Sequence, residues 1–235
     1  MSMEKKLGII MLDTKFPRVP GDVGNEASFP FPIVKKVVSG ADPQRVVLEG
    51  DQSLLKPFTD AAKELEKEGV AAITTSCGFL SMFHRELSAS VDIPVFTSAL
   101  LQVKSLADVL PKGKCVGILT ANSNSLGEKH FRGVGIEQVE KVVYGMENTY
   151  FHDAIVGNLP DRDESKTEAC VVEVALKMLR EHPEVGAIVL ECTNMPPYAR
   201  AISSATGLPV FDIITMADCV MQACCGDYRY YKRAL

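Results

Sequence analysis

Hydrophobic positions along the chain follow two alternating patterns. Short runs rich in Val, Ile and Leu alternate with longer stretches in which apolar residues recur at helical spacing. Near-continuous apolar runs are typical of parallel strands that are covered on both faces, and the stretches between them fit crossover helices. The pattern therefore predicts an α/β fold, with its clearest strands at Leu7–Leu12, Val70–Thr75, Cys115–Thr120 and Val185–Leu190 and shorter ones near Pro94–Thr97 and Pro209–Asp212.

Two of the intervening helices are especially clear. Residues Leu54–Glu68 keep apolar residues at helical spacing and stop at Gly69, since glycine often follows the end of a helix. The second helix, Glu164–Glu181, is expected to bury a stripe made of Val171, Val172, Ala175, Leu176 and Leu179.

The stretch between Asp13 and Pro32 follows neither pattern. It contains several Gly, Pro and Asn residues and is long for a connection inside a compact domain. We expect either a lid over a site or an irregular surface loop. For Asp22, Gly24 and Asn25 within it, we favour an ordinary Gly/Asn turn over closure on a ligand.

An internal repeat organises the rest of the chain. The segment AAITTSCGFLSMFHRELSASVDIPVF aligns without a gap with GAIVLECTNMPPYARAISSATGLPVF, so that Cys77 falls on Cys192. Two copies of one strand–turn–helix–strand unit predict two pseudo-symmetric Rossmann-like domains with parallel sheets, the first made of residues 1–98 plus 211–235 and the second of residues 99–210. Ligands of such sheets bind at the carboxyl ends of the strands, so the site is expected in the cleft between the domains.

Composition and charge narrow the functional classes. The 235 residues are 46% hydrophobic and carry a formal net charge of −5, which argues against a general nucleic-acid binder. No apolar run reaches the roughly 18 residues of a membrane span, and the opening MSMEKKLGIIMLD lacks a small-residue cleavage site. We therefore expect a cytoplasmic protein with no nucleic-acid or membrane partner, whose seven cysteines are reduced. The final helix, ADCVMQACCGDY, has no CxxC and no nearby histidine, so no metal site is expected there.

Two cysteines differ from the others because they occupy the same position in each repeat. Cys77 and Cys192 each end an apolar strand and precede a predicted helix, Ser81–Ala89 and Pro196–Ala205. A helix N-terminus and its free N–H groups draw a thiol toward thiolate and also bind carboxylates. A thiolate on one face of a carbon acid and a thiol on the other can exchange a proton and invert the stereocentre. A lone cysteine is more often a core residue, which is how we interpret Cys115 and Cys170.

At these residues the sequence resembles the aspartate/glutamate racemase superfamily, which includes hydantoin racemases, maleate isomerases and arylmalonate decarboxylases. The resemblance covers essentially the whole chain, and its motifs are TTSCGF, LECTNMPPY and the strand end ILTANS. It implies a two-domain pseudo-symmetric fold with Cys77 and Cys192 as the acid/base pair, and no cofactor. It further implies that the substrate carboxylate is bound by Thr193 and by the backbone amides of Gly78 and Phe79, with a second carboxylate-binding turn at Thr120 and Asn122.

The sequence departs from the racemases at several of these positions. Racemases often carry Asn-Thr after the first cysteine, whereas Gly78-Phe79 here removes side-chain hydrogen bonds to the substrate and leaves the backbone donors. Phe79 suggests contact with an apolar part of the ligand. Asn194 stands where glutamate racemases have histidine, and the stretch around Cys192 is only similar to their Gly-Cys-Thr. Asp13 either orients a substrate ammonium or is a turn or cap residue.

Together these observations predict a cofactor-independent racemase in which two cysteines act on a carbon α to a carboxylate, such as that of aspartate or glutamate. A maleate-type cis–trans isomerase and an arylmalonate-type decarboxylase remain open, although arylmalonate decarboxylases have glycine at the position of Cys77. A non-catalytic protein that binds small acids is the third alternative, because a fold does not establish activity. The expected partner is a small carboxylate-containing substrate. Because dimers are common in this superfamily, the resemblance also implies a homodimer.

Overall fold

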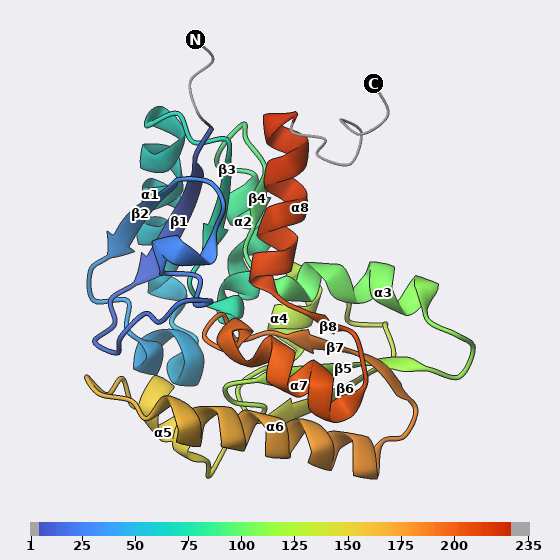
Figure 1. The fold of residues 1–235 in the computed structure, drawn as a ribbon. Helices are drawn as coiled ribbons and strands as arrows, with labels where there is room; N and C mark the ends of the chain where they lie inside the picture. The colour runs from blue at the N-terminus through green and yellow to red at the C-terminus, as the bar shows by residue number, and fades with distance from the viewer. Residues whose placement is uncertain (1–4, 227–235) are drawn as a thin grey trace.

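Each half of the chain folds around its own four-stranded parallel sheet (Figure 1). In the computed structural model, which describes residues 5–226, the strand order is β2-β1-β3-β4 in the first sheet and β6-β5-β7-β8 in the second. The two sheets therefore have one topology, which confirms the α/β class and the pseudo-symmetric repeat. The strands are β1 (Leu7–Leu12), β2 (Ile33–Val38), β3 (Ala72–Thr75), β4 (Val95–Phe96), β5 (Cys115–Thr120), β6 (Lys141–Gly145), β7 (Val185–Leu190) and β8 (Val210–Phe211).

Helices connect these strands and cover both sheets. Helix α1 buries one apolar face, including Phe58 and Leu65, and the chain leaves it through Gly69, whose φ of 76° suits glycine. Helix α6 begins after Asp163, whose carboxylate accepts a hydrogen bond from the N–H of Lys166. The helices are α1 (Leu55–Lys67), α2 (His84–Ser88), α3 (Val103–Val109), α4 (Glu128–Gly133), α5 (Tyr150–Ile155), α6 (Glu164–Glu181), α7 (Ala199–Thr206) and α8 (Ile213–Cys225).

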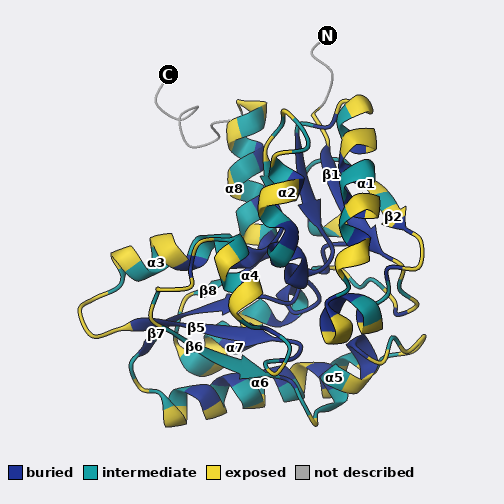
Figure 2. Cartoon of the chain, turned by 180° about the vertical axis from the view of Figure 1, so that it is seen from behind, coloured by how far each residue is buried: buried dark blue, intermediate teal, exposed yellow. Residues whose placement is uncertain are grey.

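The last helix crosses back to the first sheet. Although α8 follows β8 of the second sheet, its buried residues Ile213, Ala217 and Met221 pack with Leu7 and Ile9 of β1. Figure 2 shows the buried strands and the exposed outer faces of the helices. The domain limits, residues 1–98 plus 211–235 and 99–210, stay a prediction, and residues 1–4 and 227–235 lie outside the described residues. Within residues 5–226, no helix is long and apolar enough to cross a membrane.

Some local predictions need correction. The two edge strands β2 and β6 were not expected from the sequence. The buried stripe of α6 is centred on Val171, Ala175 and Met178, while Val172, Leu176 and Leu179 are only partly buried. Cys115 is buried as expected, but Cys170 is only partly buried. The predicted helices after the two cysteines begin as 3₁₀ segments, Gly78–Phe83 and Pro196–Tyr198, before α2 and α7.

Candidate active site

The carboxyl ends of the four inner strands, β1, β3, β5 and β7, meet at one pocket. The pocket has an empty volume of about 360 Å³, including space open to solvent, and residues from both halves line it. Its lining contains five of the predicted site residues, which are Cys77, Gly78, Phe79, Cys192 and Thr193. Two strand-end turns that are far apart in the sequence thus place both repeated cysteines at one site.

Both thiols are strongly shielded from solvent. Cys77 is 8% exposed and Cys192 is 7% exposed. Burial, and to a lesser extent the charge of Glu191, raise the pKa of Cys77 to about 12, although the N–H groups of Phe79 and Leu80 act in the opposite direction. Burial also raises the pKa of Cys192, again with Glu191 contributing. The predicted pull of a helix N-terminus toward thiolate is therefore outweighed by burial in this structure.

The turn after β7 holds a buried acid that sequence reasoning missed. Glu191 is fully buried in the pocket lining, and its Oε2 accepts a hydrogen bond of 2.7 Å from Thr120 Oγ1. Its Oε1 has no hydrogen-bond partner among the described residues. Burial raises the pKa of Glu191 to about 8, so the carboxyl group is protonated at neutral pH. The sequence contained one indication of this role, because an acidic residue, Glu191, precedes Cys192 where the similar Gly-Cys-Thr stretch of the racemases has glycine.

The remaining predicted binding residues lie at different distances from the pocket. The hydroxyl of Thr193 donates to the carbonyl oxygen of Ser76 at 2.6 Å and thereby joins the two halves beside the cysteines. Thr120 reaches the pocket through Glu191. Asn122 follows two residues later and is buried, and its Nδ2 lies 3.3 Å from His152 Nε2. Asn122 is not among the residues that line the pocket.

Asp13 does not reach the pocket. Its side chain is exposed and accepts a hydrogen bond of 3.0 Å from the N–H of Gly40. This placement matches the turn or cap alternative for Asp13 and leaves the orientation of a substrate ammonium without support.

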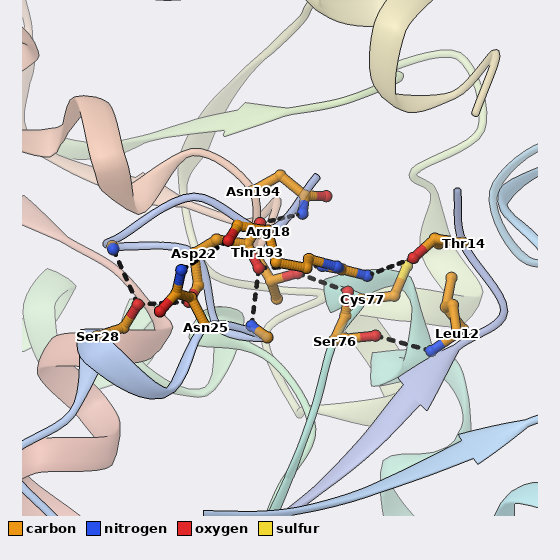
Figure 3. A network of polar contacts seen from close by, with 12 residues as sticks. Leu12, Thr14, Arg18, Asp22, Asn25, Ser28, Ser76, Cys77, Thr193 and Asn194 are labelled. Carbon is orange, nitrogen blue, oxygen red and sulfur yellow. Dashed lines mark hydrogen bonds and ion pairs between the residues drawn. The ribbon is translucent and has the colours of Figure 1, made fainter. Parts of the chain in front are cut away.

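The long segment between β1 and β2 covers one side of the site. Asp22 is fully buried, and its Oδ2 accepts a hydrogen bond of 2.6 Å from Asn194 Nδ2 (Figure 3). Its Oδ1 accepts bonds from Arg18 Nη1 at 3.1 Å and from the N–H of Gly24 at 2.7 Å. Asn194 Oδ1 accepts from the thiol of Cys192 at 3.7 Å. Residues 22–25 do form the turn that we favoured, since the N–H of Asn25 donates to the carbonyl oxygen of Asp22, but this turn is largely buried and bonded to the cysteine strand end.

Replacing Asp22 by asparagine is expected to lower the free energy of unfolding by about 1–2 kcal/mol. An amide donor at this position faces the Nδ2 of Asn194 and leaves a buried donor without an acceptor. Urea denaturation measures the change. Glu26→Gln is the matched control, because Glu26 pairs with Lys35 at the exposed surface, and we expect it to change stability by at most about 0.5 kcal/mol. Equal effects of the two substitutions would contradict the role of Asp22.

The walls of the pocket are apolar, and none of the described residues that line it is a lysine, arginine or histidine. Apolar side chains from both halves form the walls, among them Phe16, Val47, Phe79, Ile155 and Val156. Arg18 acts on Cys77 electrostatically but is paired with Asp22. Among residues 5–226, no group of three or more His, Cys, Asp or Glu side chains is arranged to hold a metal ion. The site thus offers thiols, neutral donors and apolar surface.

Comparison with known proteins shows which proteins this chain is similar to. The family model of the Asp/Glu/hydantoin racemases matches residues 40–223. A dimethylsulfoniopropionate lyase of Durusdinium sp. clade D is 34% identical over 220 residues, covering 90% of this chain and 72% of the relative. Among solved structures, a glycine-to-cysteine mutant of arylmalonate decarboxylase aligns with a TM-score of 0.65 at 16% identity, and the aspartate racemase of Picrophilus torridus with 0.60 at 17%, each over 94% of both chains.

The two solved structures show the likeness of fold alone, whereas the family model spans most of the chain. It includes both cysteine turns and the buried acid Glu191. The chain therefore belongs to the Asp/Glu/hydantoin racemase family.

Proposed function

We propose that this protein is a lyase that removes the proton α to a carboxylate and expels a cationic sulfur group from the β carbon, as in the cleavage of dimethylsulfoniopropionate. The pocket carries the proposal. Two buried thiols stand among neutral donors and apolar walls, with no cationic side chain in the lining. Such a site lacks a partner for the second carboxylate of aspartate or glutamate, whereas methyl groups on a sulfonium fit apolar and aromatic walls. The dimethylsulfoniopropionate lyases among the relatives support the same chemistry.

The reaction needs one base. A cysteine thiolate takes the α proton, the C–H electron pair forms the double bond, and the C–S bond breaks with its electron pair leaving on dimethyl sulfide. The products are acrylate, dimethyl sulfide and a proton held by the cysteine, which returns it to solvent. The positive charge of the substrate favours this path, because a cation in the pocket lowers the raised pKa of a buried thiol.

We infer that Cys77 is the base and Cys192 stays protonated. The N–H groups of Phe79 and Leu80 and the charge of Arg18 all favour the thiolate of Cys77. Burial and the charge of Glu191 oppose the thiolate at both cysteines, but at Cys192 only the N–H of Asn194 favours it, and the charges of Cys77 and Asp22 oppose it further. The thiol of Cys192 also donates to the Oδ1 of Asn194, an acceptor that stabilises the protonated form.

The test follows the fate of the α proton in deuterated buffer. Purified protein is incubated with dimethylsulfoniopropionate, and proton NMR monitors the vinyl signals of acrylate while headspace gas chromatography detects dimethyl sulfide. We expect both products in equal amounts. If no acrylate forms and no α-proton signal is lost, the proposal is refuted.

Racemisation is the second candidate, and one observation favours it. Cys77 and Cys192 come from equivalent positions of the two halves and line one pocket, an arrangement suited to proton exchange on opposite faces of a carbon. The same NMR experiment with single enantiomers of aspartate and glutamate separates the candidates. Loss of the α-proton signal with inversion and without elimination would establish the racemase.

A further inference from the structure

We propose that Glu191 binds the substrate carboxylate as a neutral acid, its Oε1 hydroxyl donating a hydrogen bond in place of the side chain that is missing at Gly78. The inference rests on the proposed function only in that both place a carboxylate in this pocket. It gives the site a specificity residue that neither the cysteines nor the backbone amides supply.

The packing of the two turns supports this exchange of roles. A Cβ atom added to Gly78 would lie 2.2 Å from Glu191 Oε1 and 2.2 Å from the Glu191 carbonyl oxygen. The carboxyl group of Glu191 therefore fills the volume that a side chain at position 78 would occupy. Racemases often have asparagine at the position of Gly78 and glycine just before the second cysteine. In this chain the small residue, Gly78, follows the first cysteine, and the large residue, Glu191, precedes the second. The carboxyl group of Glu191, which belongs to the second half of the molecule, thus supplies a hydrogen-bonding group where a side chain at position 78 of the first half would lie.

The hydrogen bonds of Glu191 determine which oxygen can act. Oε2 already accepts the hydroxyl of Thr120, whereas Oε1 is fully buried and has no partner among residues 5–226. A buried polar atom without a partner is unfavourable unless a ligand or water completes it. With Oε2 occupied as an acceptor, the proton of the neutral acid lies on Oε1. This hydroxyl stands beside Gly78, whose backbone amide is a predicted carboxylate donor.

A protonated carboxyl group is suited to this task in a site whose lining has no cationic side chain. Neutral acids held in apolar sites donate hydrogen bonds to developing oxyanions. As the α proton leaves, negative charge builds on the substrate carboxylate, and a donor at this place stabilises that charge.

The sign of the pH dependence follows from the groups around Glu191. Burial raises its pKa to about 8, so it donates below that pH and becomes a negative charge that repels a carboxylate above it. Among the described residues, the other titratable or charged groups around the site are Cys77, Cys192, the Asp22–Arg18 pair and His130, which packs edge-on against Phe79 and whose pKa burial lowers to about 4. Both thiols have raised pKa values, about 12 at Cys77, so Glu191 ionises first on the alkaline side.

The experiment measures binding, which does not depend on turnover. Isothermal titration with 3-(methylthio)propanoate, an unreactive carboxylate without a sulfonium, is run from pH 6 to pH 9.5. For the wild type we expect the affinity to fall about tenfold per pH unit above pH 8. Glu191→Gln keeps a donor, so we expect binding within about threefold of wild type at pH 7 and little change up to pH 9.5. Glu191→Ala is expected to bind at least about tenfold more weakly at pH 7.

Glu184→Gln, just before the other end of β7, is the matched control and should retain the wild-type pH profile. The inference is overturned if Glu191→Gln keeps the alkaline loss, if Glu191→Ala binds as tightly as the wild type, or if the wild type does not bind the probe. If the binding pattern is as expected but no acrylate forms from dimethylsulfoniopropionate, the proposed lyase fails and the role of Glu191 stands.

Discussion

Replacing Cys77 by serine is expected to slow removal of the α proton by about 10²–10⁴-fold, the usual contribution of a general base. A serine hydroxyl is far less acidic than a thiol, so the N–H groups of Phe79 and Leu80 cannot hold it as an anion. The rate is followed by acrylate formation from dimethylsulfoniopropionate. The same substitution at Cys192 separates the mechanisms, because a lyase with a single base keeps more than a tenth of its rate, whereas a two-base racemase loses activity with either change.

The control for this experiment is Cys115→Ser. Cys115 is also buried, but it lies at the amino end of β5, away from the pocket. It carries the same chemical change without contact to the site, so we expect its activity per folded molecule to match the wild type. An active Cys77→Ser protein would exclude Cys77 as the base.

Replacing Gly78 by alanine is expected to lower the free energy of unfolding by about 3 kcal/mol, at the upper end of overpacking effects. The added methyl group collides with both the carbonyl oxygen and Oε1 of Glu191 at 2.2 Å. Urea denaturation measures this loss. A second substitution, Glu191→Gly, removes the side-chain collision and loosens the backbone, so the double variant should regain part of the stability.

Gly127→Ala provides the comparison for this pair. A methyl group at Gly127 has nothing within 4 Å, and its φ of −140° suits any residue. We expect a change of at most about 0.5 kcal/mol. If Glu191→Gly destabilises the Gly78→Ala protein as much as it destabilises the wild type, the two positions are independent and their packing does not explain the effect.

The fully buried parts of the fold could be predicted from the sequence. Strands β1, β5 and β7 and helix α6 have the predicted limits, because residues covered on both faces leave continuous apolar runs. The edge strands left no such signal. β2 contains Lys35 and Lys36 and an exposed Val37, and every residue of β6 is only partly buried. Edge strands tolerate polar residues, so their pattern resembles that of a loop.

Some residues of the candidate site could likewise be predicted from the sequence, and others could not. The repeat placed Cys77 and Cys192 at equivalent strand ends, and topology then brings them into one pocket. Glu191 was overlooked because its burial and raised pKa depend on contacts with Gly78 and Thr120, which the sequence does not display. The position of Asp22 likewise depends on how a long segment folds over the other half.

The uneven exposure of the cysteines also affects how this protein reacts with thiol reagents. Cys219 and Cys225 are exposed on α8, while the thiols of the pocket are almost completely covered. Alkylating agents will therefore modify the cysteines of α8 first. The number of labelled thiols will rise before any activity is lost. Storage in air favours bridges between molecules through the same helix. Inactivation by such reagents thus identifies the pocket cysteines only when the outer two have been replaced.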